Sequence, residues 1–187
     1  MFIGVTCQFL QKTDPRFPLV YFTVWSGILA GVIAIAGVRR YSRLELPRVS
    51  AAVGVVVSGV IFAVVIAPAT ATGTWFQPWD DLAVRIANVL LHGVAPVLVV
   101  TDLILRPPTQ RLSRWLGAAY GWPMLYFIAI ATSAMAVPYA MPYAFLSPQD
   151  VGWPTVLGAV AASIALFTVV ALVLFLAAKR SRRRRRG

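Results

Sequence analysis

The chain has 187 residues, of which 59% are hydrophobic and 12% are charged, and its formal net charge is +11. A water-soluble domain of this length cannot bury so large an apolar fraction, so the composition excludes a soluble globular protein and indicates an integral membrane protein. The single cysteine, Cys7, excludes an internal disulfide and a cysteine-based zinc cluster, and we assign it no role. Arginine and alanine greatly outnumber lysine, which indicates a GC-rich bacterial source.

We do not expect residues 1–16 to form a signal peptide, because they lack a basic head and contain only a short apolar run. Five later segments are long enough to cross a hydrocarbon layer of about 30 Å as helices, and too long and continuously apolar for barrel strands. We therefore expect an all-α, polytopic transmembrane helical bundle in one domain, residues 1–178, and a basic cytoplasmic tail, residues 179–187. The expected spans are residues 17–38, 50–70, 83–105, 113–136 and 153–178.

The basic residues alternate between connections. All of them except Lys12, Arg16 and Arg85 lie in the first connection, the third connection and the C-terminal tail. The second and fourth connections contain aspartate and no Lys or Arg. By the positive-inside rule, the C-terminus is cytoplasmic and the N-terminus lies outside. The tail, KRSRRRRRG, anchors this topology and favours anionic lipid headgroups, and it lacks the aromatic partners that nucleic-acid binding would need.

The two outward connections, residues 71–81 and 137–154, are rich in tryptophan, tyrosine and proline. One interpretation is an aromatic belt at the headgroup layer. The other is a partly immersed cap, too rich in proline for a regular helix, that lines an entrance for a lipid substrate. Within the spans, the pairs Gly27/Gly31 and Gly117/Gly121 predict close approach between helices.

The third span contains the most polar residues. Arg85, Asn88 and His92 are spaced by three and four residues, so they lie along one helix face, and Pro96 one turn later is expected to kink the helix. His92 is the only histidine, and one histidine without nearby cysteines cannot build a usual zinc site. Two interpretations stay open: a neutral histidine bonded across helices, or a general base that needs an adjacent nucleophile.

A candidate nucleophile lies in the first span. At about 1.5 Å per residue, Thr23 lies roughly 9 Å and His92 roughly 15 Å inside the outer boundary, so helix tilt could bring them together. The alternative is that the hydroxyls of Thr23 and Ser26 bond to carbonyls one turn earlier, as is usual in membrane helices.

Three segments resemble the androgen-induced membrane-protein family and its bacterial relatives: YFTVWSG (21–27), NVLLHGVAPVLVVTDLIL (88–105) and YAFLSPQDVGW (143–153). Family members typically have six spans, whereas this chain shows five. We expect either that a short or missing first helix is tolerated or that the true start lies upstream. The animal members are threonine hydrolases of fatty acid esters of hydroxy fatty acids. By position in these motifs, the resemblance implies Thr23 as the nucleophile and His92 as the base.

The resulting hypothesis is an intramembrane lipid ester hydrolase without cofactor or metal. Thr23 attacks the ester carbonyl while His92 takes its proton, and water releases the acyl-threonine. We expect Asn88 to hold the imidazole. Arg85 either binds a substrate carboxylate or extends to the outer surface, and the Ser26 hydroxyl or the Trp25 indole supplies an oxyanion donor.

Asp102 lies about 15 Å from His92 along the same span, too far to orient the ring. We expect it to pair with an arginine such as Arg106 or to cap the inner surface. The expected partners are membrane lipids or a long-chain ester, with no nucleic acid, and the oligomeric state stays open. Two rival hypotheses remain: a non-enzymatic lipid-binding or transport protein, and a structural bundle that acts through partners.

Overall fold

The computed structural model describes residues 1–14, 16–136 and 143–185, and these form helices and connections without a strand. The part of the expected outer cap at 137–142 lies outside the described residues. Two of the short segments, η3 and η4, are π-helical, and η1, η2 and η5 are 3-10 turns. The elements are α1 (Phe2–Leu10), η1 (Pro18–Val20), α2 (Phe22–Arg40), η2 (Tyr41–Leu44), α3 (Glu45–Ile61), η3 (Phe62–Ile66), α4 (Leu82–Asn88), η4 (Val89–Val94), α5 (Ala95–Leu105), α6 (Leu112–Ala136), η5 (Ala144–Leu146) and α7 (Pro148–Arg184).

Three helical segments among the described residues are long and apolar enough to cross a membrane. They are Glu45–Ile66, Leu82–Leu105 and Pro148–Arg184, with mean hydropathies of 2.7, 1.9 and 2.8. The apolar stretch of α2, Phe22–Val38, is shorter. The prediction of a helical membrane protein is thus confirmed, and α2 and α6 cover the other two expected spans without meeting the same criterion.

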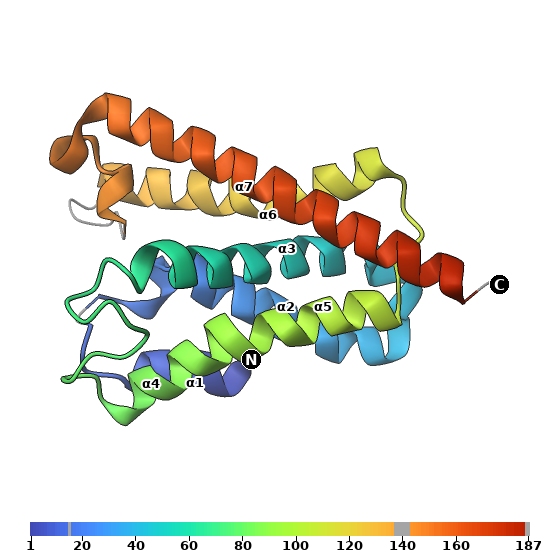
Figure 1. Cartoon of the computed structure of the whole chain (residues 1–187), viewed down its shortest axis with the longest axis horizontal. Helices are drawn as coiled ribbons and strands as arrows, with labels where there is room; N and C mark the ends of the chain where they lie inside the picture. The colour runs from blue at the N-terminus through green and yellow to red at the C-terminus, as the bar shows by residue number, and fades with distance from the viewer. Residues whose placement is uncertain (15, 137–142, 186–187) are drawn as a thin grey trace.

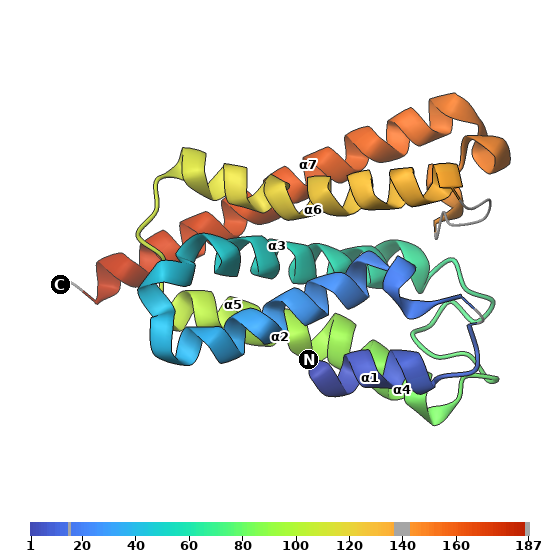
Figure 2. The same ribbon diagram turned by 180° about the vertical axis from the view of Figure 1, so that it is seen from behind.

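Helix α3 occupies the centre of the molecule (Figures 1 and 2), where it contacts α2, α5, α6 and α7. α6 and α7 form a pair along one side of it, and α2, α5 and the short α1 and α4 cover the other side. The main core forms around α3, because Val49, Val53 and Val57 are fully buried at four-residue spacing, with Trp115 and Ala171 from α6 and α7 in the same cluster.

The two ends of the bundle differ in chemistry. One end, which we call the basic end, holds the turn between α2 and α3, the connection between α5 and α6, and the C-terminal residues 179–185 (Figure 1, right). The opposite end, which we call the aromatic end, holds residues 11–21, 67–81 and 143–147 (Figure 1, left). The alternation of basic connections along the sequence therefore corresponds to a separation in space.

The glycine pairs behave differently from one another. A Cβ atom on Gly27 would lie 3.2 Å from Leu91, and one on Gly31 would lie 2.9 Å from the ring of Phe2, so both glycines allow close packing as expected. A Cβ atom on Gly117 or Gly121 would meet nothing within 4 Å in the described part of the chain. The close approach predicted for this second pair is not met among the described residues: both glycines line an open groove with Leu46, Pro47 and Ser50 of α3.

Candidate functional site

The centre of the site is a contact between the two π-helical segments. η3 begins with Phe62 and η4 contains His92, and their rings stack with centroids 3.9 Å apart and planes at 6°. The helices can approach because Gly59 lacks a side chain: a Cβ there would lie 2.9 Å from the His92 carbonyl oxygen and from Pro96. Single-turn π segments are frequent at functional sites. Pro96 has no N–H to donate to the His92 carbonyl, and its ring would clash with that carbonyl in a regular helix. This explains why the distortion lies at His92.

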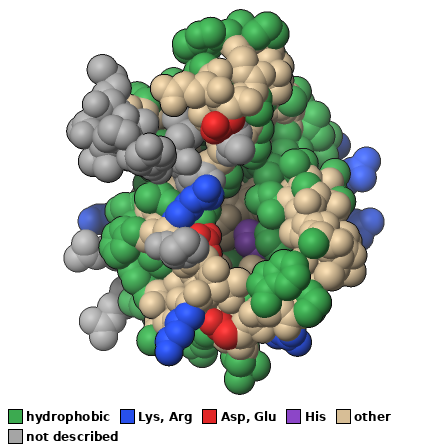
Figure 3. Space-filling model, turned by 90° about the vertical axis from the view of Figure 1, so that its left-hand side faces the viewer, with side chains coloured by type: hydrophobic (Ala, Val, Ile, Leu, Met, Phe, Trp, Pro, Cys, Tyr) green, Lys and Arg blue, Asp and Glu red, His purple; other side chains and the backbone are tan. Residues whose placement is uncertain are grey.

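A cavity of about 500 Å³ lies next to this contact and has both Thr23 and His92 in its wall. A volume of about 300–1,000 Å³ is typical of sites for small ligands. The aromatic end of the molecule is hollowed there, and the single histidine is visible at the floor of the hollow among apolar side chains (Figure 3). The sequence-based expectation that α2 and the third span contribute to one site therefore agrees with the lining of this cavity.

The hydroxyl of Thr23 is not used by the fold. Thr23 is half-buried, and among the described residues no hydrogen bond involves its side chain. The alternative in which Thr23 bonds to a carbonyl one turn earlier is therefore not what the structure has. Thr23 also borders a second, smaller cavity of about 40 Å³, which Ser58, Ser163 and Tyr143 line as well.

His92 is held by packing more than by hydrogen bonds. Its Nδ1 atom is buried and has no hydrogen-bond partner, and the backbone of Ser58 borders the ring. Trp75 packs against Phe62 on the side of the outer connection, with ring centroids 5.3 Å apart. The ring of His92 is therefore fixed on an aromatic surface, and its orientation does not depend on a charged partner.

Hydrogen bonds order the connection 67–81 at the aromatic end. The buried side chain of Gln77 donates to Thr72 Oγ1 at 2.8 Å, and its backbone N–H donates to Asp80 Oδ2 at 2.8 Å. Asp81 caps α4, accepting from the N–H of Val84 at 2.9 Å and from that of Lys12 at 2.7 Å. These backbone donors hold the pKa of Asp81 below its ordinary value. Tyr143 and Phe145 of the second outward connection line the cavity of about 500 Å³, whereas residues 71–81 contribute nothing to its lining, so the choice between a belt and a cap stays a prediction.

Polar residues form the rim of the cavity. Tyr21 donates to Asp14 Oδ2, and Asp14 Oδ1 accepts from the backbone N–H of Arg16 at 2.9 Å. Burial, followed by the bond to Asp14, raises the pKa of Tyr21, so its hydroxyl stays protonated. Tyr143 lies in both cavity walls, and burial raises its pKa to about 12. The rim thus combines one acidic group, one basic group and neutral phenols.

Asn88 bonds to the outer connection instead of the imidazole, and Arg85 extends to the same connection, in line with the second of the two roles expected for it. The Asn88 amide lines the cavity but donates to the carbonyl of Trp75 at 3.2 Å, and no hydrogen bond among the described residues joins it to His92. Arg85 donates to the carbonyls of Asp80 at 3.1 Å and Gln77 at 3.2 Å. The two side chains lie on the expected helix face, but the connection 67–81 folds back over that face and uses their donors.

Ser26 and Trp25 are also occupied elsewhere. The Ser26 hydroxyl is fully buried and accepts from the Trp122 indole at 3.1 Å. The Trp25 indole donates to the carbonyl of Leu19 at 2.7 Å. Neither residue lines a cavity with Thr23, so the prediction that one of them supplies an oxyanion donor is not met. Both hydrogen bonds tie α2 to its neighbours.

Sequence analysis missed Ser58. This serine lies inside an apolar stretch of α3, with only 5% of its surface exposed and with no hydrogen-bond partner for its hydroxyl. Only its position one turn before Phe62 and next to Gly59 distinguishes it from the other hydroxyls in the chain. No local pattern in the sequence signals that position, because the contact with His92 is made across helices.

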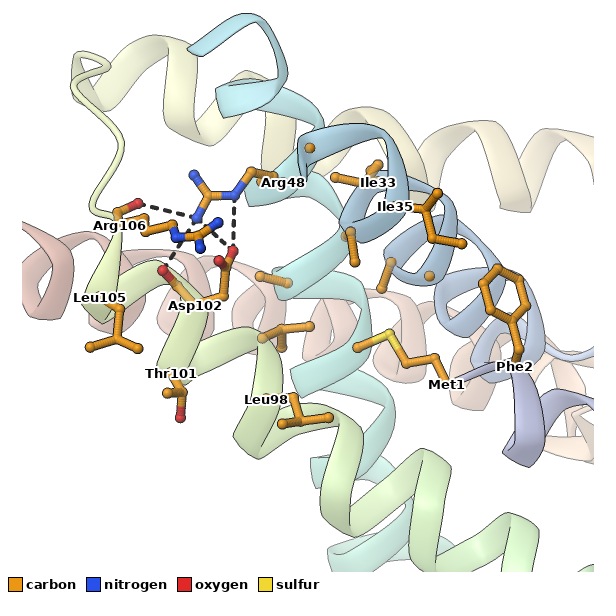
Figure 4. A pocket seen from close by; sticks show the side chains of 17 residues that line it. Met1, Phe2, Ile33, Ile35, Arg48, Leu98, Thr101, Asp102, Leu105 and Arg106 are labelled. Carbon is orange, nitrogen blue, oxygen red and sulfur yellow. Dashed lines mark hydrogen bonds and ion pairs between the residues drawn. The ribbon is translucent and has the colours of Figure 1, made fainter. Parts of the chain in front are cut away.

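A further cavity, of about 530 Å³, lies at the basic end between α2, α3 and α5 (Figure 4). At one end of it the buried Arg48 donates from Nε and Nη2 to Asp102 Oδ2, at 2.9 and 2.5 Å, and from Nη2 to the carbonyl of Arg106 at 3.1 Å. Asp102 forms an ion pair with Arg48, so the expected pairing with an arginine is made by a residue of another helix. The partner comes from α3, which sequence spacing along the third span does not indicate.

Among the described residues no group of three or more His, Cys, Asp or Glu side chains could hold a metal ion. Comparisons of the chain with protein-family models, with curated proteins and with solved structures found no match. The resemblance to the androgen-induced membrane-protein family therefore rests on the three sequence motifs, and the activity it implies is a proposal.

Proposed function

We propose that this protein is a membrane-embedded hydrolase of long-chain esters, with Thr23 as nucleophile and His92 as general base. Fatty acid esters of hydroxy fatty acids are the substrate class that the family resemblance suggests. The observation that carries the proposal is the shared cavity: Thr23, with a hydroxyl free of hydrogen bonds to the described residues, and the only histidine line one hollow that opens at the aromatic end. A catalytic nucleophile must be available in this way.

In the proposed reaction, Thr23 Oγ1 attacks the ester carbonyl and His92 takes the hydroxyl proton. The ring nitrogen that receives the proton is Nε2, because Nδ1 is buried. The imidazolium then protonates the leaving alkoxide, and a water molecule activated by His92 hydrolyses the acyl-threonine. Stacking on Phe62 keeps the ring in place through both proton transfers.

The cavity of about 500 Å³ that Thr23 and His92 line suits an ester with a polar group and an apolar chain. Its inner wall contains Val24, Phe62 and Val65, and its rim contains Asp14, Arg16 and Tyr21. An apolar wall accepts the chain, and Arg16 is the basic residue in the lining that favours the carboxylate of a hydroxy fatty acid ester. This assigns to Arg16 the role that the sequence suggested for Arg85.

We also propose the membrane arrangement that this chemistry requires. α2 and α6 cross the membrane beside the three longer spans, as their alignment with α3 supports. The basic end faces the cytoplasm and the aromatic end faces outward. The ester then enters from the outer headgroup layer, below the connection 67–81.

Purified protein tested on a long-chain p-nitrophenyl ester decides between this proposal and its rivals. We expect Thr23→Ala and His92→Ala to lower kcat by at least about 10³-fold, as loss of a nucleophile or its base does in other hydrolases. Thr23→Ser should retain turnover, because it keeps the hydroxyl. Turnover that survives both alanine substitutions would overturn the proposal.

The second candidate function is non-enzymatic lipid binding. The cavity at the basic end favours it, because that cavity is largely apolar and shares no lining residue with the cavity of Thr23 and His92. In that case no ester is consumed, and native mass spectrometry of the purified protein detects the same retained lipid in the parent protein and in Thr23→Ala.

A further inference from the structure

Among the described residues, Ser58 Oγ is the buried hydroxyl oxygen without a hydrogen-bond partner. Several other helix hydroxyls bond to a carbonyl one turn earlier: Ser163 donates to Ala159 at 2.8 Å and Thr168 to Ile164 at 2.7 Å. An unpaired buried hydroxyl destabilises the folded state, because it loses its hydrogen bonds to water and gains none. A group retained at this cost is a candidate for a function.

Ser58 lies close to both proposed catalytic residues. Its backbone borders the His92 ring, and the residue lines the cavity of about 40 Å³ that also has Thr23 in its wall. That space suits one small polar atom or a water molecule, since a water occupies about 30 Å³ in the liquid, and it is too small for an acyl chain. Thr23 lines this small cavity and the cavity of about 500 Å³ as well, together with Ile66, Tyr143 and Phe145.

We propose that the Ser58 hydroxyl is an oxyanion donor, which binds the carbonyl oxygen of the ester as Thr23 attacks. This inference rests on the proposed hydrolase function. The Thr23 Oγ1–carbon bond forms, the carbonyl electron pair moves onto the oxygen in the small cavity, and His92 takes the threonine proton. Ser58 keeps its own proton and donates a hydrogen bond to that oxygen, until the carbonyl re-forms and the alkoxide leaves with the proton from His92.

The other hydroxyls near Thr23 differ in how their O–H groups are used. Ser163, in the same small cavity, donates its O–H to its own helix. Tyr143 accepts from the N–H of Phe22 at 3.2 Å, which leaves its O–H as a second donor in that cavity. Ser26 lies outside the lining. Ser58 is therefore the serine in the described lining whose hydroxyl is free to turn toward a new acceptor.

Ser163→Ala is the matched control for Ser58→Ala, because both remove a serine hydroxyl from the same small cavity. With the full-length protein and a long-chain p-nitrophenyl ester, we expect Ser58→Ala to lower kcat by about 10²-fold, typical of losing one oxyanion donor, with little change in KM. The Tm of Ser58→Ala should be equal to or above that of the parent protein. Ser163→Ala should keep kcat within about threefold of the parent, since its hydroxyl does not turn toward substrate.

Two outcomes overturn the assignment of Ser58. One is a kcat of Ser58→Ala close to that of the parent protein while Thr23→Ala is inactive, which leaves the Thr23–His92 pair standing. The other is a fall in kcat together with a lower Tm, which assigns the hydroxyl to packing. Turnover that persists in Thr23→Ala is the separate result that removes the proposed function itself.

Discussion

The polar side chains at the two ends of the bundle differ in whether they have partners within the fold. At the aromatic end Thr23, Ser58 and His92 have polar atoms that the fold does not use. At the basic end Arg48 and Asp102 form an ion pair across α3 and α5. Unused polar atoms in an apolar interior are costly to stability, whereas matched ones hold helices in register. The aromatic end is therefore the candidate reaction site, and the ion pair at the basic end is structural.

The ion pair gives a prediction at this scale. Asp102→Ala removes the carboxylate from the guanidinium of Arg48, whose side chain is 5% exposed, and we expect it to lower stability by about 2 kcal/mol. The cost is below the ~3–5 kcal/mol of a fully buried pair, because Asp102 is 43% exposed. Thermal unfolding in detergent measures this effect. Ester turnover should be unchanged below the unfolding temperature, and a selective loss of turnover would contradict a structural role.

At the scale of elements, the close approach of α3 to η4 is the feature that positions His92. Gly59 makes it possible, since a Cβ there would lie 2.9 Å from the His92 carbonyl oxygen and from Pro96. We expect Gly59→Ala to cost about 1–3 kcal/mol through overpacking and to lower kcat, because it separates α3 from the segment that carries the base. Gly117→Ala on α6 is the control, since its Cβ would meet nothing within 4 Å. Equal effects from the two substitutions would show that this contact has no special role.

The helices themselves could be predicted from sequence, because apolar runs of this length must satisfy their backbone groups internally. Their roles at the site could be predicted only in part. His92 stands out as the lone histidine in an apolar segment, and the family resemblance singled out Thr23 beside it; their chemical roles stay predictions. The partners of Asn88, Arg85 and Asp102 were not predicted, because they depend on how the connection 67–81 and helix α3 fold against the third span. Ser58 has no local signal.

For the whole molecule, the separation of the basic and aromatic ends predicts the orientation in the membrane. In a Cys7→Ala background, a cysteine at Thr74 in the outer connection should react with a membrane-impermeant maleimide in intact cells. A cysteine at Thr109, in the connection between α5 and α6, should react only after lysis. Both threonines are exposed, so accessibility in the folded protein does not bias the comparison. The reverse labelling pattern would place the proposed site on the cytoplasmic side.

The central claim is that Thr23 forms an ester with the acyl group of the substrate. The most direct measurement is mass spectrometry of the full-length protein quenched during turnover of a long-chain p-nitrophenyl ester. We expect an added acyl mass on the peptide that contains Thr23. This mass should be absent in Thr23→Ala and reduced in His92→Ala. Steady turnover by the parent protein with the acyl group on another residue, or with the same adduct in Thr23→Ala, would contradict it.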